Sequence, residues 1–351
     1  MVSATFGRAE ELVDNSPGRV TGEWDMGDPL PSPRRAHLLR TSVNSQLCDS
    51  LRSALGAVRQ VLPKQAAAAD AVVAALDVHR RIAPGVFSQY HHLSSGVREQ
   101  NIAQVVTALA QLRLRHENNA LFSDELDVSP MKWDESDSAT AQYIFSPLGP
   151  RGPNGELGEM LDIPKARFDE CAAQVHPALE LLRASCVDMY GEIDALVAGI
   201  RLMDGEHIGS VSSPRSFGLI HLAPPTSPAE RADPLLHLIL LITHETSHIV
   251  LNAMMTHDPL VLNDPAERYS SPLRRDPRPI SGIYHAVFVL SRIVHVLGRV
   301  RHHHDTPLLS LIIESSTSNM RKAFDTVQEN GRLSPDGRRL LDSCATLVGR
   351  P

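Results

Sequence analysis

Apolar positions recur at three- and four-residue steps over most of the chain, the pattern of helices that pack one face on a core. The first run starts near His37 and stops at Pro63. Further runs predict helices over 64–82, 96–116, 164–203, 234–256, 281–301, 307–330 and 335–348. Short β-like runs at 207–213 and 216–223 could pair as a ribbon. The pattern therefore predicts a mainly α fold with a small β-ribbon before the helix that starts at 234.

Two stretches lack helical periodicity. Residues 1–35 are rich in Gly and Pro and predict a loose extension, and residues 123–162 predict a loop region. We expect one mainly helical catalytic domain over 36–351, made of a helical part at 36–122, the loop region, and a metal-site part at 163–351. His91 and His92 fall in a turn-like stretch, where a solvent-facing position is expected.

Composition narrows the range of functions. Apolar residues make up 42% and charged residues 21% of 351 residues, as in soluble globular proteins. Only 4% are aromatic and the net charge is −7, which argues against nucleic-acid binding. The apolar run 235–242 is short for a bilayer and contains His237, no signal peptide is evident, and the four cysteines form no C-x-x-C. We expect a cytoplasmic protein without a membrane partner.

Seventeen histidines are unusual, and two of them form a motif. His244, Glu245 and His248 stand in the run LLITHETSHIVLNAM, and Asp233 with Pro234 can cap and start this helix. Residues four apart lie on one helix face, so both imidazoles can reach the same metal ion. The alternative is a pair of histidines hydrogen-bonded inside a helical core.

A metal site on this helix needs a third ligand. Met254 stands six residues after His248, so the short metzincin motif is absent. Glu267 and Glu314 are downstream candidates, but neither lies in an apolar helical setting. His285 is the stronger candidate, because it belongs to a second apolar helix that can pack beside the first. A core histidine is the alternative for His285.

The segment between the two helices, YSSPLRRDPRPISG, carries Arg274, Arg275 and Arg278 among prolines. Prolines stiffen a loop, and a held guanidinium is suited to bidentate binding of a carboxylate. This predicts a carboxylate-binding loop beside the metal. The alternative is a solvated basic loop.

The segments HETSHIVLNAMMTHDPL and SSPLRRDPRPISGIYHAVFVLSRI resemble the HExxH-motif peptide-modification family of ribosomal peptide natural-product pathways. The family pattern runs H-E-x-Q-H, an apolar helix, and then a segment like P-W-R-x-D-P-R-P-x-G-G-x-x-H. The preceding run SFGLIHLAPP also resembles the family, and the likeness covers residues 205–300. The chain departs from the pattern at Ser247, Leu273 and Ser281, where the family has Gln, Trp and Gly. The matching positions of the second segment are Pro272, Arg274, Asp276, Pro277, Arg278, Pro279, Gly282 and His285.

This resemblance implies an iron(II)- and 2-oxoglutarate-dependent hydroxylase that acts, with O₂, at Cβ of a residue in a ribosomally made peptide or an amino acid. His244, His248 and His285 would then be the metal ligands. Glu245 would be the catalytic acidic residue, orienting a ligand or substrate. The expected partners of the distal carboxylate of 2-oxoglutarate are, in order, Arg278, Arg274 and Arg292.

A zinc-dependent HExxH metallopeptidase is the alternative activity, with Glu245 as general base. A scaffold protein that keeps the motif without a metal is a third possibility. The co-substrate separates these hypotheses, because only the hydroxylase requires 2-oxoglutarate.

Overall fold

The computed structural model describes residues 25–144, 158–271 and 276–349, and over these ranges the protein is mainly α with a small sheet. The predicted fold class is confirmed. The N-terminal part holds α1 (Pro33–Arg59), α2 (Pro63–Ala75), α3 (Pro84–Arg98), α4 (Ile102–Glu117), β1 (Asp127–Pro130) and α5 (Glu135–Ile144). The middle holds β2 (Glu159–Leu161), α6 (Lys165–Ser185), α7 (Val187–Leu196), β3 (Gly199–Leu202), β4 (Asp204–Glu206), β5 (Ser210–Ser212), η2 (Pro214–Ser216) and β6 (Leu219–Leu222). The C-terminal part holds α8 (Pro228–Ala232), α9 (Pro234–Met255), α10 (Ile280–Val300), α11 (Pro307–Asn330) and α12 (Pro335–Leu347).

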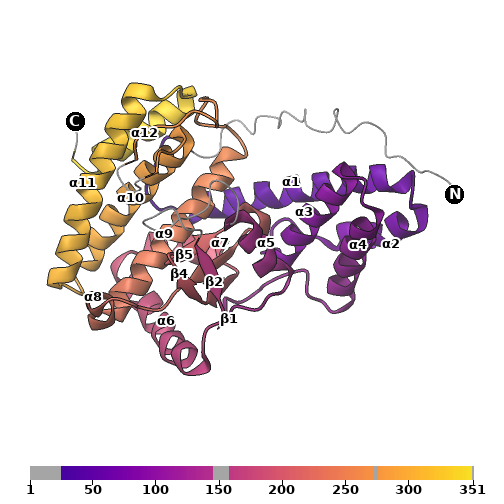
Figure 1. Ribbon diagram of the computed structural model, residues 1–351, viewed down its shortest axis with the longest axis horizontal. Helices are drawn as coiled ribbons and strands as arrows, with labels where there is room; N and C mark the ends of the chain where they lie inside the picture. Colours follow the sequence, from indigo (N-terminus) through magenta and orange to yellow (C-terminus); the bar gives the residue numbers. More distant parts are fainter. Residues whose placement is uncertain (1–24, 145–157, 272–275, 350–351) are drawn as a thin grey trace.

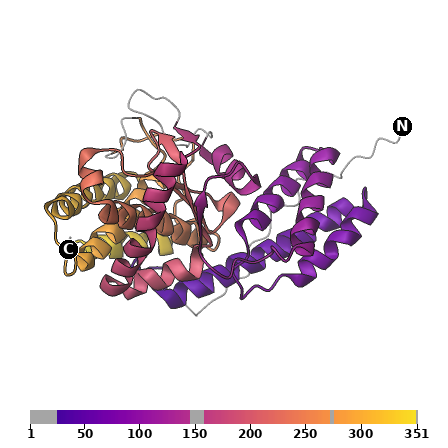
Figure 2. The ribbon, with the colours of Figure 1, turned by 90° about the horizontal axis from the view of Figure 1, so that it is seen from below.

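The elements follow one long axis (Figure 1). Helices α10, α11 and α12 lie at one end, α2 and α4 lie at the other, and α9 lies with the strands between them. Figure 2 shows α1 running from the middle of the molecule out to the N-terminal helices. A single cluster of buried apolar side chains continues from α1 to α12, so both ends share one core.

The larger sheet has four strands in the order β1-β3-β6-β5. β1 and β6 both pair with β3 in parallel, and β5 pairs with β6 antiparallel, with Ser210 opposite Leu222. β2 and β4 form a separate two-stranded pair. The expected ribbon at 207–223 is therefore present, as one edge of a larger sheet that the apolar pattern did not indicate.

The predicted helix over 164–203 is broken in two and is wrong in its last seven residues, 197–203. Cys186 has φ −147°, which ends α6, and α7 stops at Leu196. Gly199 begins β3, where an added Cβ would lie 3.1 Å from the Leu219 side chain. A short apolar run buried on both faces has no period that separates strand from helix.

Three further expectations need correction. The loop region contains β1, α5 and β2, and the turn-like stretch with His91 and His92 is the helix α3. The expectation of a loose extension is also wrong for its last part, because the buried Arg35 side chain donates hydrogen bonds to the carbonyls of Asp28 and Leu30. Residues 25–35 are thus packed down, while 1–24 lie outside the described residues.

Two of the described helices, α9 and α10, are long and apolar enough by length and composition to cross a membrane. In each, 67% of the apolar window is buried within the protein. A core helix of a soluble protein gives the same signal, so these two helices are weak evidence for a membrane span.

Candidate functional site

The motif helix α9 begins as its sequence predicts. Asp233 accepts a hydrogen bond from the backbone N–H of Leu236 at 3.1 Å, and Pro234 occupies the first turn. His244 and His248 follow one turn apart, and their Nε2 atoms lie 3.1 Å from each other. The His244 side chain keeps 38% of its surface exposed, so a small ligand can reach the pair.

This spacing fits two ligands of one metal ion. Imidazole nitrogens bind such ions at about 2.0–2.1 Å, which sets two neighbouring ligand nitrogens roughly 3.0–3.4 Å apart. The separation between His244 and His248 falls inside that interval. The distance between these two nitrogens is therefore compatible with a shared metal ion.

His285 comes from α10 and joins the pair. Its ring stacks on the ring of His248 with centroids 5.5 Å apart and planes at 25°. The Nδ1 atoms of these two rings are 3.3 Å apart, and His285 Nε2 lies 3.2 Å from the sulfur of Met255. The structure therefore brings together all three histidines expected as ligands.

The three rings do not yet present their nitrogens to one point. His248 directs Nε2 toward His244 and Nδ1 toward His285, so it meets its neighbours with different ring nitrogens. Consistent with this, the described ranges contain no group of three His, Cys, Asp or Glu side chains already arranged to hold a metal. Binding by all three histidines requires a change in ring orientation, which for imidazoles is a soft rotation.

His248 and His285 both favour the neutral imidazole, which is the form that binds metals. Burial, together with the neighbouring His244 and His285, lowers the pKa of His248 well below its ordinary value. Burial also lowers the pKa of His285 to about 4. Since only the neutral imidazole has a free lone pair for a metal, a site at neutral pH does not first have to lose these protons.

Glu245 is anchored from the sheet. Ser210 donates a hydrogen bond to Oε1 of Glu245 at 2.6 Å, and Ser212 donates to Oε2 at 2.7 Å. The carboxylate is almost fully buried, and its Oε1 lies 3.9 Å from Nε2 of His244. Both serines belong to β5, and no pattern in the sequence indicated them as partners of Glu245. Glu245 is thus a carboxyl group held in a fixed position beside the histidine cluster.

Arg278 precedes α10. Its backbone N–H and C=O both pair with Tyr269 at 2.8 Å, and its Nε forms an ion pair with Asp276 at 2.8 Å. Arg278 stands seven residues before His285 and two residues before α10 begins at Ile280. Arg274 lies outside the described residues.

Arg292 is placed differently from the other two arginines. It is fully buried, and its guanidinium donates to Ser247 at 2.9 Å, to the carbonyl of Pro29 at 2.9 Å and to the carboxylate of Glu192. Glu192 also pairs with Arg35 at 3.4 Å. These contacts make Arg292 part of a buried ion-pair network, and the structure does not bring it to the histidine cluster.

The glutamates considered as alternative ligands lie elsewhere. Glu267 pairs with Arg332 at 3.1 Å and accepts hydrogen bonds from Asn263 and Tyr269. Glu314 is exposed on α11. His237, on the motif helix itself, contacts the carbonyl of Ala223 at 3.0 Å. Of the candidates for a third ligand, only His285 contacts the motif pair.

Comparisons with known proteins add no assignment, because neither the protein-family models nor the curated proteins give a match to this chain.

Proposed function

We propose that the chain is an iron(II)- and 2-oxoglutarate-dependent oxygenase that hydroxylates, at Cβ, a residue of a ribosomally made peptide or an amino acid. The observation that carries the proposal is the cluster of three imidazoles from α9 and α10. A set of nitrogen ligands with open positions suits iron(II) together with a chelating 2-oxo acid and O₂. The family resemblance of residues 205–300 supplies the choice of reaction.

The residues around the cluster have distinct tasks in this proposal. His244, His248 and His285 would hold iron, which supplies the site where O₂ is reduced. Glu245, held by Ser210 and Ser212, would orient His244 or the substrate. Arg278, held by its backbone pairing and its neighbouring prolines, binds the distal carboxylate of 2-oxoglutarate.

The overall reaction balances without a further reductant. The C–H bond and 2-oxoglutarate are both oxidised by one O₂, and the products are the alcohol, succinate and CO₂. The experiment is to supply iron(II), 2-oxoglutarate and a short peptide encoded next to the gene, and to measure succinate and peptide mass. We expect succinate in step with a gain of one oxygen atom, and none with the His244→Ala protein. Turnover that does not require 2-oxoglutarate overturns the proposal.

One observation favours a second candidate, the zinc metallopeptidase. Glu245 Oε1 lies 3.9 Å from His244 Nε2, so its carboxylate is close to where a metal-bound water would stand. A peptidase would cleave the same peptide with zinc and ignore 2-oxoglutarate. The mass of the product, a fragment or an oxidised full-length peptide, separates the two activities.

A further inference from the structure

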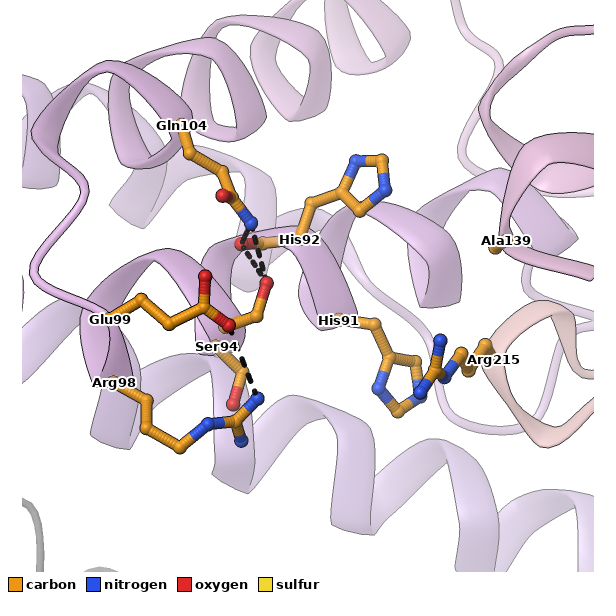
Figure 3. A pocket seen from close by; sticks show the side chains of 9 residues that line it. His91, His92, Ser94, Arg98, Glu99, Gln104, Ala139 and Arg215 are labelled. Atoms are coloured by element: carbon orange, nitrogen blue, oxygen red, sulfur yellow. Dashed lines mark hydrogen bonds and ion pairs between the residues drawn. The ribbon is translucent and has the colours of Figure 1, made fainter. Parts of the chain in front are cut away.

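A polar cavity of about 520 Å³ lies among α3, the start of α4, α5 and η2 (Figure 3). Its walls include His91 and His92 of α3, Ala139 of α5 and Arg215 of η2. None of the residues of the histidine cluster line it, so it is a separate site. The volume is enough for a small metabolite.

The lining carries an excess of positive charge. Arg98 and Arg215 contribute two guanidinium groups, and Glu99 contributes one carboxylate, which lies 3.9 Å from Arg98 in an exposed ion pair. The whole chain has a net charge of −7, so this local sign is opposite to that of the molecule. Guanidinium groups are the usual partners of carboxylate and phosphate groups.

Two imidazoles stand next to this charge. Burial, together with the charge of Arg215, lowers the pKa of His91 to about 4. Burial and Arg215 also lower the pKa of His92. Figure 3 shows the His91 ring directed toward the Arg215 guanidinium, while the His92 ring points away from it on the same side of the cavity as α4.

The walls of the cavity are fixed by local hydrogen bonds. The amide of Gln104 donates to the carbonyl of His92 at 2.9 Å, which ties α4 to α3. Thr140 and Ser216 share a hydrogen bond of 2.7 Å, which ties α5 to η2. The helices that carry the lining side chains are thus held together before any ligand arrives, which lowers the entropy cost of binding.

We propose that this cavity binds a small anionic ligand through a phosphate or carboxylate group, with Arg215 and Arg98 as charged donors and the two imidazoles beside them. The inference does not depend on the proposed oxygenase activity. The two sites are nevertheless linked through the chain, because Arg215 follows Ser212 by three residues and Ser212 holds Glu245.

The test is calorimetric titration of the full metal-free chain with inorganic phosphate and, separately, with malonate. We expect one saturable site, and at least about tenfold weaker binding in Arg215→Gln and in Arg98→Gln, since each removes a charge-assisted hydrogen bond. Arg113→Gln is the matched control, because Arg113 pairs with Glu117 on the exposed face of α4. Tighter binding of phosphate identifies a phosphorylated ligand, and tighter binding of malonate identifies a carboxylate.

The His244→Ala protein separates this site from the histidine cluster. It should bind the preferred anion as the unmutated chain does. Thermal midpoints measured without the anion show whether each variant is folded. If Arg215→Gln does not fold, the affinity of Arg98→Gln for the anion tests the proposal. The proposal is overturned if neither anion saturates, if both arginine variants bind normally, or if only His244→Ala loses binding.

Discussion

Oγ of Ser247 accepts a hydrogen bond from Nε of Arg292 over 2.9 Å, so the residue before the second motif histidine rests on a guanidinium from α10. Ser247 also donates to the carbonyl of Thr243 at 2.7 Å. Arg292 in turn forms a buried ion pair with Glu192 of α7. Ser247, where the family that this chain resembles has Gln, therefore joins α9 to α10 and α7.

Removing the charge of Arg292 should destabilise the fold strongly. Arg292→Met leaves the buried carboxylate of Glu192 with weaker compensation, which typically costs about 3–5 kcal/mol. Arg301→Met, at the exposed end of α10, should cost no more than about 0.5 kcal/mol. Urea unfolding measures both. Equal losses in the two variants are the result that contradicts a buried network.

The hydroxyl groups of β5 should stabilise the carboxylate of Glu245. Ser212→Ala is expected to lower the free energy of unfolding by about 1–3 kcal/mol, because a buried carboxylate loses a donor. Iron content should not change, since the serine is not a ligand. Ser315→Ala, on an exposed part of α11, is the matched control. Equal free energies of unfolding for Ser212→Ala and Ser315→Ala would contradict a stabilising hydrogen bond from Ser212 to Glu245.

Arg278→Lys should raise the concentration of 2-oxoglutarate needed for half-maximal turnover about tenfold, because an ammonium cannot form the two parallel hydrogen bonds of a guanidinium. Bound iron should stay the same. Arg268→Lys, exposed before the same segment, is the control. If Arg278→Lys needs no more 2-oxoglutarate than the unmutated protein and Arg274→Lys needs more, then Arg274 and not Arg278 binds the distal carboxylate.

His91 should make stability depend on pH. In the folded protein its pKa is about 4, lowered by burial and Arg215, while its ordinary value is 6.5. As pH falls below about 6.5 the unfolded chain takes up this proton first, so the free energy of unfolding falls until about pH 4. His91→Gln should reduce that slope by one proton, about 1.4 kcal/mol per pH unit. Parallel urea-stability curves for both proteins between pH 4 and 6.5 contradict this.

The long C-terminal helices could be predicted from the sequence. The predicted 307–330 coincides with α11, and the predicted start of α9 at Pro234 is confirmed by the Asp233 cap. These helices have sustained apolar faces and clear capping residues. By contrast α5 is polar along most of its length, and α3 starts at Pro84 and Gly85, which indicate a break when tertiary packing is unknown.

Parts of the candidate site could not be predicted from the sequence either. The His244 and His248 pair follows from spacing within one helix, and His285 follows from the apolar pattern of the next. The partners Ser210 and Ser212 of Glu245 lie on a short strand, and only the tertiary fold brings them to α9. Glu192 pairs with Arg292 across 100 positions of sequence, a contact that no local pattern predicts.

The central claim is that His244, His248 and His285 bind one iron(II) ion together. Anaerobic titration with iron(II), counting ions bound per chain, tests it most directly. We predict one tightly bound ion in the unmutated protein and in the exposed-surface control His302→Ala, and a loss of tight binding in each of the three histidine-to-alanine variants. Full iron binding by His285→Ala, combined with its loss in Glu267→Ala or Glu314→Ala, would contradict the account.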